Sequence, residues 1–143
     1  MQQVNKHAIE FEPPDLMHVT LNGPLRLEDV SDVGWHAVQG SKEFPYVLLL
    51  IDISLFEYDG TTPESRRVMA EVSRNLRYRG VALLGGRGPE RLLFRFVLRA
   101  VNLFTRGDNP FRFFETEQEA RAWLDERRRA IRAEAAAGRG RAP

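Results

Sequence analysis

The sequence predicts an α/β domain in which helices flank a mixed, mostly parallel sheet. The first observation is residues 46–54, a short run of large apolar residues that only Asp52 interrupts before Ser54 ends it. Because the run is continuous and does not alternate, it is typical of a strand buried on both faces. The second is that segments with helical spacing separate the later strand-like segments, as parallel connections require. The third is that 143 residues, 43% of them hydrophobic, are enough for one domain with a buried core. We therefore expect the order β-β-α-β-α-β-α-β-α.

The chain is expected to open with an antiparallel hairpin. Residues 7–12 alternate loosely and end at Pro13-Pro14, and residues 16–22 run apolar up to a Gly-Pro pair. Two such runs separated by a short turn-rich segment indicate paired strands. Proline has no N–H group to donate to a neighbouring strand, so it favours an edge position for the first strand.

The first helix is expected between the hairpin and the central strand. From Leu27 to Gln39 the apolar residues recur at three- and four-residue spacing, and acidic residues occupy the first turn. Acidic side chains suit the positive end of a helix dipole. Gly40 is expected to stop this helix.

A second helix follows the central strand. Thr62 precedes a proline and a glutamate, which is a typical helix start: a side-chain cap, a proline in the first turn and an acidic residue just inside. We expect this helix to end at Gly80. Residues 81–84 are all aliphatic and predict a second short buried strand.

The third helix, expected from Glu90 to Phe104, is unusually apolar. Its leucine, valine and phenylalanine side chains cover well over half of its circumference. A helix that packs on a sheet needs an apolar stripe only about 100° wide. The excess apolar surface must therefore be covered by a loop, a partner or a ligand.

The last predicted elements are a strand and a helix. Residues 111–114 read as an edge strand, and residues 116–119 form a capping-box pattern that begins a helix. The buried face of this helix is expected to contain Ala120, Trp123, Leu124 and Ile131. We expect one domain over residues 1–133 and a disordered basic tail over residues 134–143, because the tail has little apolar bulk.

Composition and charge exclude several classes of function. The chain has no cysteine, which removes disulfides and thiolate chemistry and fits a reducing cytoplasm. After Glu126 the chain has six arginines and one glutamate, a net charge of +5. Because the net charge of the whole chain is +1, the part up to Glu126 has a net charge of −4. A nucleic-acid-binding domain normally has the opposite sign, so we expect no nucleic-acid partner. No apolar run is long enough to cross a membrane, which takes about 20 residues, and no leader is expected at the N-terminus.

No catalytic or metal-binding signature is present. The three histidines, His7, His18 and His36, have no spacing that would bring two of them together, so we expect no metal. Residues 85–88 form a glycine-rich loop, but the lysine of a nucleotide-binding loop and the third glycine of a dinucleotide fingerprint are missing. No serine lies in a nucleophile elbow. We therefore expect no cofactor and no enzymatic activity.

Several local strings resemble the bacterial SpoIIAA-like proteins, small domains of the STAS fold, which is the fold of anti-sigma-factor antagonists. The matching strings are residues 23–29, the strand residues 47–52, and residues 113–124, where a strand end, a capped helix start and an Ala-x-x-Trp-Leu pattern coincide. The resemblance covers about residues 8–128. It implies a binding or regulatory module rather than an enzyme, and a structural relationship to CRAL-TRIO lipid-transfer domains.

The resemblance also implies a place for a phosphorylated hydroxyl group. In anti-sigma-factor antagonists a serine or threonine is phosphorylated at the start of the helix after the central strand, in an Asp-Ser-Ser/Thr-Gly-like string. The nearest equivalent here is residues 59–62, with Thr61 and Thr62 as candidate phosphoacceptors and with the glycine before the hydroxyl groups. Both threonines are also ordinary helix caps, and this alternative stays open.

Two sets of residues are candidates for binding. Asp52 and Ser54 lie at the carboxyl end of the central strand, where α/β sheets place ligand crevices, although Asp52 could equally accept local backbone hydrogen bonds. The other set belongs to the apolar third helix and the loop before the second helix: Phe56, Tyr58, Phe94, Leu98 and Val101. It could meet a second copy of the chain, a lipid or other apolar ligand, or neighbouring parts of the same monomer.

The function expected from these observations is a non-enzymatic regulatory or protein-interaction module of STAS type. The contact surface would be the third helix together with residues 55–62. The alternative is a carrier or sensor of a lipid or small apolar ligand.

Overall fold

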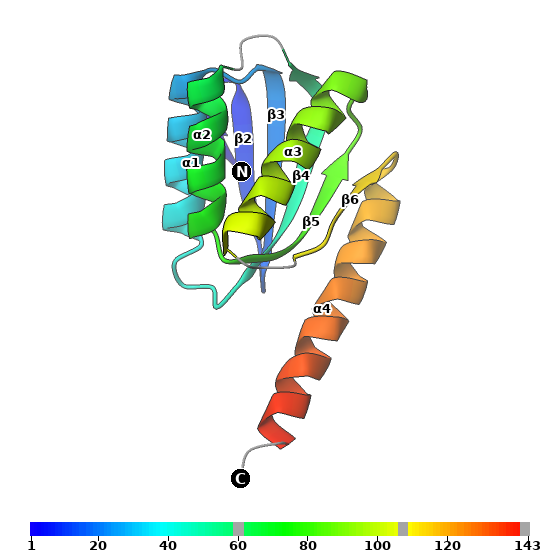
Figure 1. Ribbon diagram of the computed structural model, residues 1–143. Coiled ribbons are helices and arrows are strands. Elements are labelled where there is room, and N and C mark those ends of the chain that lie inside the picture. The colour runs from blue at the N-terminus through cyan, green and yellow to red at the C-terminus, as the bar shows by residue number, and fades with distance from the viewer. Residues whose placement is uncertain (59–61, 106–108, 141–143) are drawn as a thin grey trace.

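Six strands form one mixed sheet whose spatial order follows the chain order, within the parts of the chain that the computed structural model describes, residues 1–58, 62–105 and 109–140 (Figure 1). The elements in chain order are β1 (Gln2–Val4), β2 (His7–Glu12), β3 (Leu16–Pro24), α1 (Leu27–Gly40), β4 (Val47–Glu57), α2 (Pro63–Asn75), β5 (Tyr78–Leu84), α3 (Gly88–Thr105), β6 (Phe111–Phe114) and α4 (Glu117–Gly140). β1, β2 and β3 pair antiparallel, whereas β3, β4, β5 and β6 pair parallel. The predicted α/β class with a mixed, mostly parallel sheet is confirmed.

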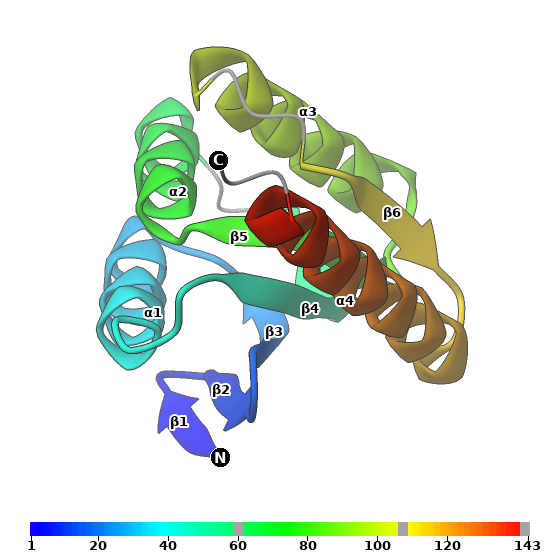
Figure 2. The same cartoon turned by 90° about the horizontal axis from the view of Figure 1, so that it is seen from below.

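The sheet has three helices on one face and one on the other. Each of α1, α2 and α3 connects one parallel strand to the next strand in the same direction across the sheet. Because such crossovers are right-handed, all three helices come to lie on the same face. Figure 2 shows this arrangement, with α4 alone on the opposite face.

Two cores correspond to these two faces. The larger core lies between the sheet and the three crossover helices, and includes Ile9, Met17, Val19, Leu49, Ile53, Val81, Leu83, Phe94, Val97 and Leu98. The smaller core lies under α4, and includes Leu16, Leu48, Leu50, Ala82, Phe114, Ala120, Leu124 and Ile131. Neighbouring residues of β4, such as Leu48 and Leu49, enter opposite cores. The continuous apolar run of this strand is thus explained by burial on both faces.

Two expectations about strand positions are wrong. β1 was not expected, because its three residues are mostly polar; it pairs with β2, so β2 is not at the edge of the sheet. The second helix ends at Asn75 rather than at Gly80, and Gly80 lies inside β5. A side chain at Gly80 would meet Leu48 at 3.3 Å, so the glycine allows close strand packing and does not end a helix.

The C-terminal segment also differs from the expectation. Residues 134–140 continue α4 as a helix, where a disordered tail was expected. Alanine and arginine are among the strongest helix formers, so this segment can continue a helix without apolar contacts. Glu134 in addition pairs with Arg79 of β5 at 2.6 Å. Figure 1 shows the last turns of α4 extending beyond the ends of the strands.

Candidate functional site

Asp52 and Ser54 lie within β4, which continues to Glu57, so the expectation that they stand at the carboxyl end of this strand is wrong. A local hydrogen bond links the two residues. The Asp52 carboxylate accepts the backbone N–H of Ser54 at 2.9 Å. For Asp52 the sequence allows either a ligand contact or a local hydrogen bond to the backbone, and the structure shows the local hydrogen bond. Ser54 is exposed and packs against Gly85 of the next strand connection, where an added side chain would meet its hydroxyl group. A ligand contact of this pair stays a prediction.

The glycine-rich connection after β5 is held by neighbouring protein groups. Gly85 and Gly86 both have positive φ angles, +77° and +85°, which favour glycine. The Arg91 side chain donates to the Gly85 carbonyl at 3.1 Å and pairs with Glu115 at 2.7 Å. These contacts describe a tight connection between β5 and α3, and none of them resembles a phosphate cradle.

Four of the five apolar candidate residues are buried. Phe56 meets Phe94 edge-on, with ring centroids 5.4 Å apart, and Leu98 and Val101 continue the same buried face of α3. These four side chains therefore belong to the larger core and do not form a surface that a protein partner could contact. Tyr58, the fifth, is exposed, and its backbone N–H donates to the buried Glu90 at 3.4 Å.

The apolar excess of α3 lies on its opposite face. Leu92, Phe96 and Leu103 are 64%, 66% and 78% exposed, although they are large apolar residues. Together with Tyr58 they line two adjoining hollows, and we call these four residues the α3 patch. The sequence indicates the excess, but the residues it names for a contact surface are on the buried stripe of the helix. Two of them, Phe94 and Leu98, line the apolar pocket described below. Separating the two apolar stripes of the helix by their spacing could have found the outer one.

The charged residues in the two hollows of the α3 patch are arginines, whereas Glu57 and Glu90 lie with Arg87 on the other side of Tyr58. Arg66 of α2 lines the hollow beside Tyr58, and Arg95 and Arg99 line the hollow beside Leu103. The Arg95 guanidinium also lies 5.4 Å from the ring centroid of Phe113, within the range of a cation–π interaction. The patch therefore has an apolar centre, and its rim is positively charged along α2 and α3.

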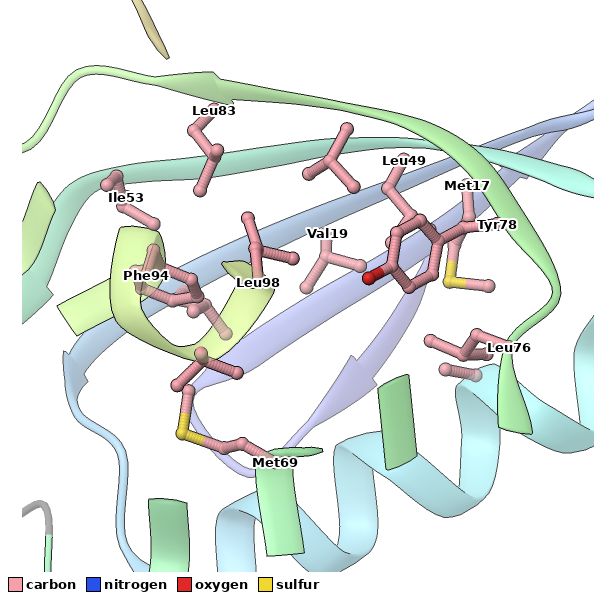
Figure 3. Close-up of a cluster of buried hydrophobic side chains, with 14 of the residues drawn as sticks. Met17, Val19, Leu49, Ile53, Met69, Leu76, Tyr78, Leu83, Phe94 and Leu98 are labelled. Atoms are coloured by element: carbon pink, nitrogen blue, oxygen red, sulfur yellow. The ribbon is translucent and has the colours of Figure 1, made fainter. Parts of the chain in front are cut away.

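A second candidate site is an apolar pocket inside the larger core. It has a volume of about 110 Å³ and lies between the sheet and α1, α2 and α3. Its lining is almost entirely apolar: Met17, Val19, Leu21, Leu25, Val30, Val33, Gly34, Ala37, Leu49, Ile51, Met69, Val72, Ser73, Leu76, Phe94, Val97 and Leu98. Figure 3 shows part of this cluster. No local pattern in the sequence indicates the pocket, because its walls come from five separate elements.

Of the two candidate phosphoacceptors, the structure describes Thr62; Thr61 lies outside the described residues. Thr62 is the N-cap of α2, where its hydroxyl oxygen accepts the Ser65 N–H at 3.0 Å and the Ser65 hydroxyl oxygen accepts the Thr62 N–H at 2.8 Å. These reciprocal hydrogen bonds give Thr62 a structural role at the start of α2. Its phosphorylation stays a prediction.

Replacing Thr62 by alanine is expected to lower the free energy of unfolding by about 1 kcal/mol, because one N–H group at the helix start loses its acceptor. Urea denaturation followed by circular dichroism measures the change. Thr62→Ser retains the hydroxyl group and serves as the control. A loss for Thr62→Ser as large as that for Thr62→Ala would contradict the capping role.

Over the described ranges, no group of three or more His, Asp or Glu side chains is arranged to hold a metal ion. His7 instead accepts the Asn22 N–H at 3.0 Å and lies 3.5 Å from Asp29. None of the helices in the described part of the chain is long and apolar enough to cross a membrane.

Comparison with known proteins adds evidence on the fold. No protein-family model and no curated protein matches the sequence. Among solved structures, an uncharacterised DUF3478-family protein with a SpoIIAA-like fold from Shewanella loihica PV-4 is similar, with 23% identity and a TM-score of 0.58 over 87% of this chain and 99% of that one. The anti-sigma-factor antagonist SpoIIAA in its unphosphorylated form is similar over 83% of this chain and 97% of that one, with 16% identity and a TM-score of 0.52. The chain therefore has the SpoIIAA-like fold of STAS domains, as the sequence resemblance implies.

Proposed function

We propose that this protein is a non-enzymatic regulatory module of STAS type that binds a protein partner through the α3 patch. The observation that carries the proposal is the exposure of Leu92, Phe96 and Leu103 side by side on one helix face. Burying a side chain of this size contributes about 1.5–3 kcal/mol. Contiguous exposed apolar surface of this kind typically marks an interaction site.

The composition of the patch resembles the centre of a protein interface. Aromatic residues and arginines are enriched at such centres, and a few of them usually carry most of the binding free energy. Here Phe96 and Tyr58 supply the aromatic groups, and Arg95 and Arg99 supply the rim. A stable interface takes about 800 Å² from each partner, so the patch would be the centre of a larger contact.

The charge of the rim favours a different protein over a second copy of this chain. In a two-fold symmetric dimer the same patch lies on both sides of the interface. Arg66, Arg95 and Arg99 of the two copies would then be brought toward each other, and like charges at an interface are unfavourable. We therefore assign the patch to a protein whose contact surface is apolar at its centre and acidic at its rim.

The proposal is tested by photo-crosslinking followed by reconstitution. A photoreactive residue at position 96 is expected to capture a specific protein in cells, and one at position 35 is the control, because Trp35 is also exposed but lies on α1. The captured protein is then purified, and its affinity for the wild type is measured. Phe96→Ser with Leu103→Ser is expected to weaken binding about 100-fold, and Trp35→Ser to leave it unchanged.

Two results would contradict the assignment. One is a purified partner whose affinity is the same for the wild type and the double variant. The other is a concentration-dependent homodimer in light scattering that the double variant abolishes, because the patch would then bind a second copy. A monomer at high micromolar concentration agrees with the proposal.

A second candidate function is supported by the apolar pocket. The pocket, at about 110 Å³, is somewhat smaller than an engineered apolar cavity of about 150 Å³ in another protein that binds benzene, so a compact apolar molecule would enter it with a small outward shift of the lining side chains. A carrier or sensor of a small apolar ligand would use this pocket and leave the α3 patch free. The two candidate functions thus depend on opposite faces of α3 and can be tested separately.

A further inference from the structure

The Tyr78 hydroxyl group is an unsatisfied donor in the larger core. Tyr78 begins β5 and is 4% exposed, and its hydroxyl oxygen is buried with no hydrogen-bond partner among the described residues. Three other buried side-chain atoms of the described residues share this property, on His18, Glu90 and Arg127, and Tyr78 is the one of the four whose ring is part of the apolar cluster of the larger core. Leaving a buried hydroxyl group unpaired costs about 1–3 kcal/mol, so phenylalanine would be the more stable residue here.

The hydroxyl group is directed into the cluster that surrounds the apolar pocket. Figure 3 shows the ring of Tyr78 beside Met17 and Leu49, with its oxygen pointing to the side of Val19 and Leu98. All four of these neighbours line the pocket, although Tyr78 itself does not. A ligand would therefore reach the hydroxyl group after a lining side chain such as Leu98 changes rotamer.

The hydroxyl group would act as a hydrogen-bond donor. Burial raises the pKa of Tyr78 to about 12, so the group remains protonated at neutral pH. The other hydroxyl group at the pocket, on Ser73, already donates to the Met69 carbonyl at 2.8 Å. Tyr78 thus supplies the unused donor beside the pocket in the described residues.

We propose that the pocket binds a small uncharged apolar molecule with one hydrogen-bond acceptor, such as a ketone or an ester, and that the Tyr78 hydroxyl group donates to this acceptor. The ligand is uncharged because the lining contains no charged side chain, and burying an unpaired charge is very unfavourable. Its apolar part would contact the leucine, valine and methionine side chains of the pocket. This inference rests on the second candidate function, the binding of a small apolar ligand.

The test uses two probes of nearly equal shape, acetophenone and its hydrocarbon counterpart ethylbenzene. Binding of each to the full-length protein is measured by isothermal titration calorimetry and by saturation-transfer NMR. The ratio of the acetophenone affinity to the ethylbenzene affinity is expected to be about three- to tenfold higher for the wild type than for Tyr78→Phe, because the hydroxyl group donates a hydrogen bond to acetophenone alone. The ethylbenzene affinity is expected to be the same for both proteins, and the melting temperature of Tyr78→Phe without ligand is expected to stay the same or rise.

The outcomes distinguish the hydrogen bond of Tyr78 from binding in the pocket itself. Equal binding of both probes to the wild type and to Tyr78→Phe would overturn the role of Tyr78 and leave the pocket as a binding site. Failure of both probes to bind would overturn the inference together with the second candidate function, but not the protein contact of the α3 patch. Val33→Phe, which places a larger side chain at a half-buried wall position, is expected to abolish binding of both probes; unchanged binding would show that they bind elsewhere.

Discussion

Replacing Asp15 by asparagine is expected to lower the free energy of unfolding by about 2–3 kcal/mol at pH 7. Asp15 lies in the turn before β3, and its side chain is only 4% exposed. It pairs with Arg128 of α4 and so links this helix to the sheet. Its carboxylate accepts two hydrogen bonds from the Arg128 guanidinium, at 2.9 and 2.7 Å, and one from the Tyr46 hydroxyl group at 2.8 Å. Asparagine keeps the shape but turns an N–H group toward Arg128, so the half-buried arginine loses its buried counter-charge and retains only the exposed Asp125.

A second ion pair of the same arginine provides the control. Arg128 also pairs with Asp125 at 2.6 Å, but Asp125 is 56% exposed. Exposed ion pairs contribute about 0–1 kcal/mol, so Asp125→Asn is expected to have a much smaller effect than Asp15→Asn. Chemical denaturation of both variants gives the two free energies. Equal losses for the two variants would show that burial of Asp15 is not what makes its pair important.

The effect of Asp15→Asn is expected to depend on pH. Burial alone raises the pKa of Asp15, but the hydrogen bonds from Arg128 and Tyr46 and the charge of Arg128 outweigh it and hold the pKa below its ordinary value. A carboxyl group with a lowered pKa stabilises the folded state above its unfolded-state pKa of about 3.9, and this contribution is lost as the pH falls through the folded-state pKa. The difference between wild type and variant should therefore be full at pH 7 and shrink below about pH 4. A difference that is constant from pH 7 to pH 3 would contradict this explanation.

Replacing Gly85 by alanine is expected to lower the free energy of unfolding by about 3 kcal/mol, from backbone strain and a steric clash together. Gly85 has a φ of +77°, and a methyl group there would lie 2.3 Å from the Ser54 hydroxyl oxygen and 3.1 Å from the Ser54 Cα atom. The hydroxyl group can rotate away, but the backbone of β4 cannot. Thermal and urea denaturation measure the loss.

Two further variants separate the strain from the clash. Gly88→Ala is the matched control, because Gly88 begins α3 and has no neighbouring atom within 4 Å of an added methyl group. It is expected to change the stability by less than about 1 kcal/mol. In a Ser54→Ala background, Gly85→Ala should cost about 1 kcal/mol less, since the hydroxyl contact is gone but the backbone strain remains. If Gly85→Ala is as mild as Gly88→Ala, this connection is not tightly packed.

Local patterns in the sequence were sufficient to identify nearly all the elements of the fold. The continuous apolar run of β4 indicated burial on both faces. The Thr62 cap indicated the start of α2, and the spacing of apolar residues indicated α1. These features depend on neighbouring residues alone. Where local signals were weak, as in the short β1 and in the glycine of β5, the prediction was wrong. Gly80 reads locally as a helix stop, and only its packing against Leu48 shows that it belongs to a strand.

The candidate sites depended on the tertiary structure. The composition of α3 revealed that it has more apolar residues than one interface needs, but the rotation of the helix against the sheet determines which ones face outward. The sequence therefore named Phe94, Leu98 and Val101, which are buried, in place of Phe96 and Leu103.

By itself, then, the sequence determined the fold class, the absence of cysteine chemistry and the existence of an apolar surplus on one helix, because each of these is a property of composition or of local spacing. The tertiary structure alone decided the pairing of Asp15 with Arg128, 113 positions apart, and the burial of the Tyr78 hydroxyl group beside a pocket. The physical reason is that hydrogen-bond partners and cavities arise where distant segments pack together, and no local pattern in the chain records which segments will meet.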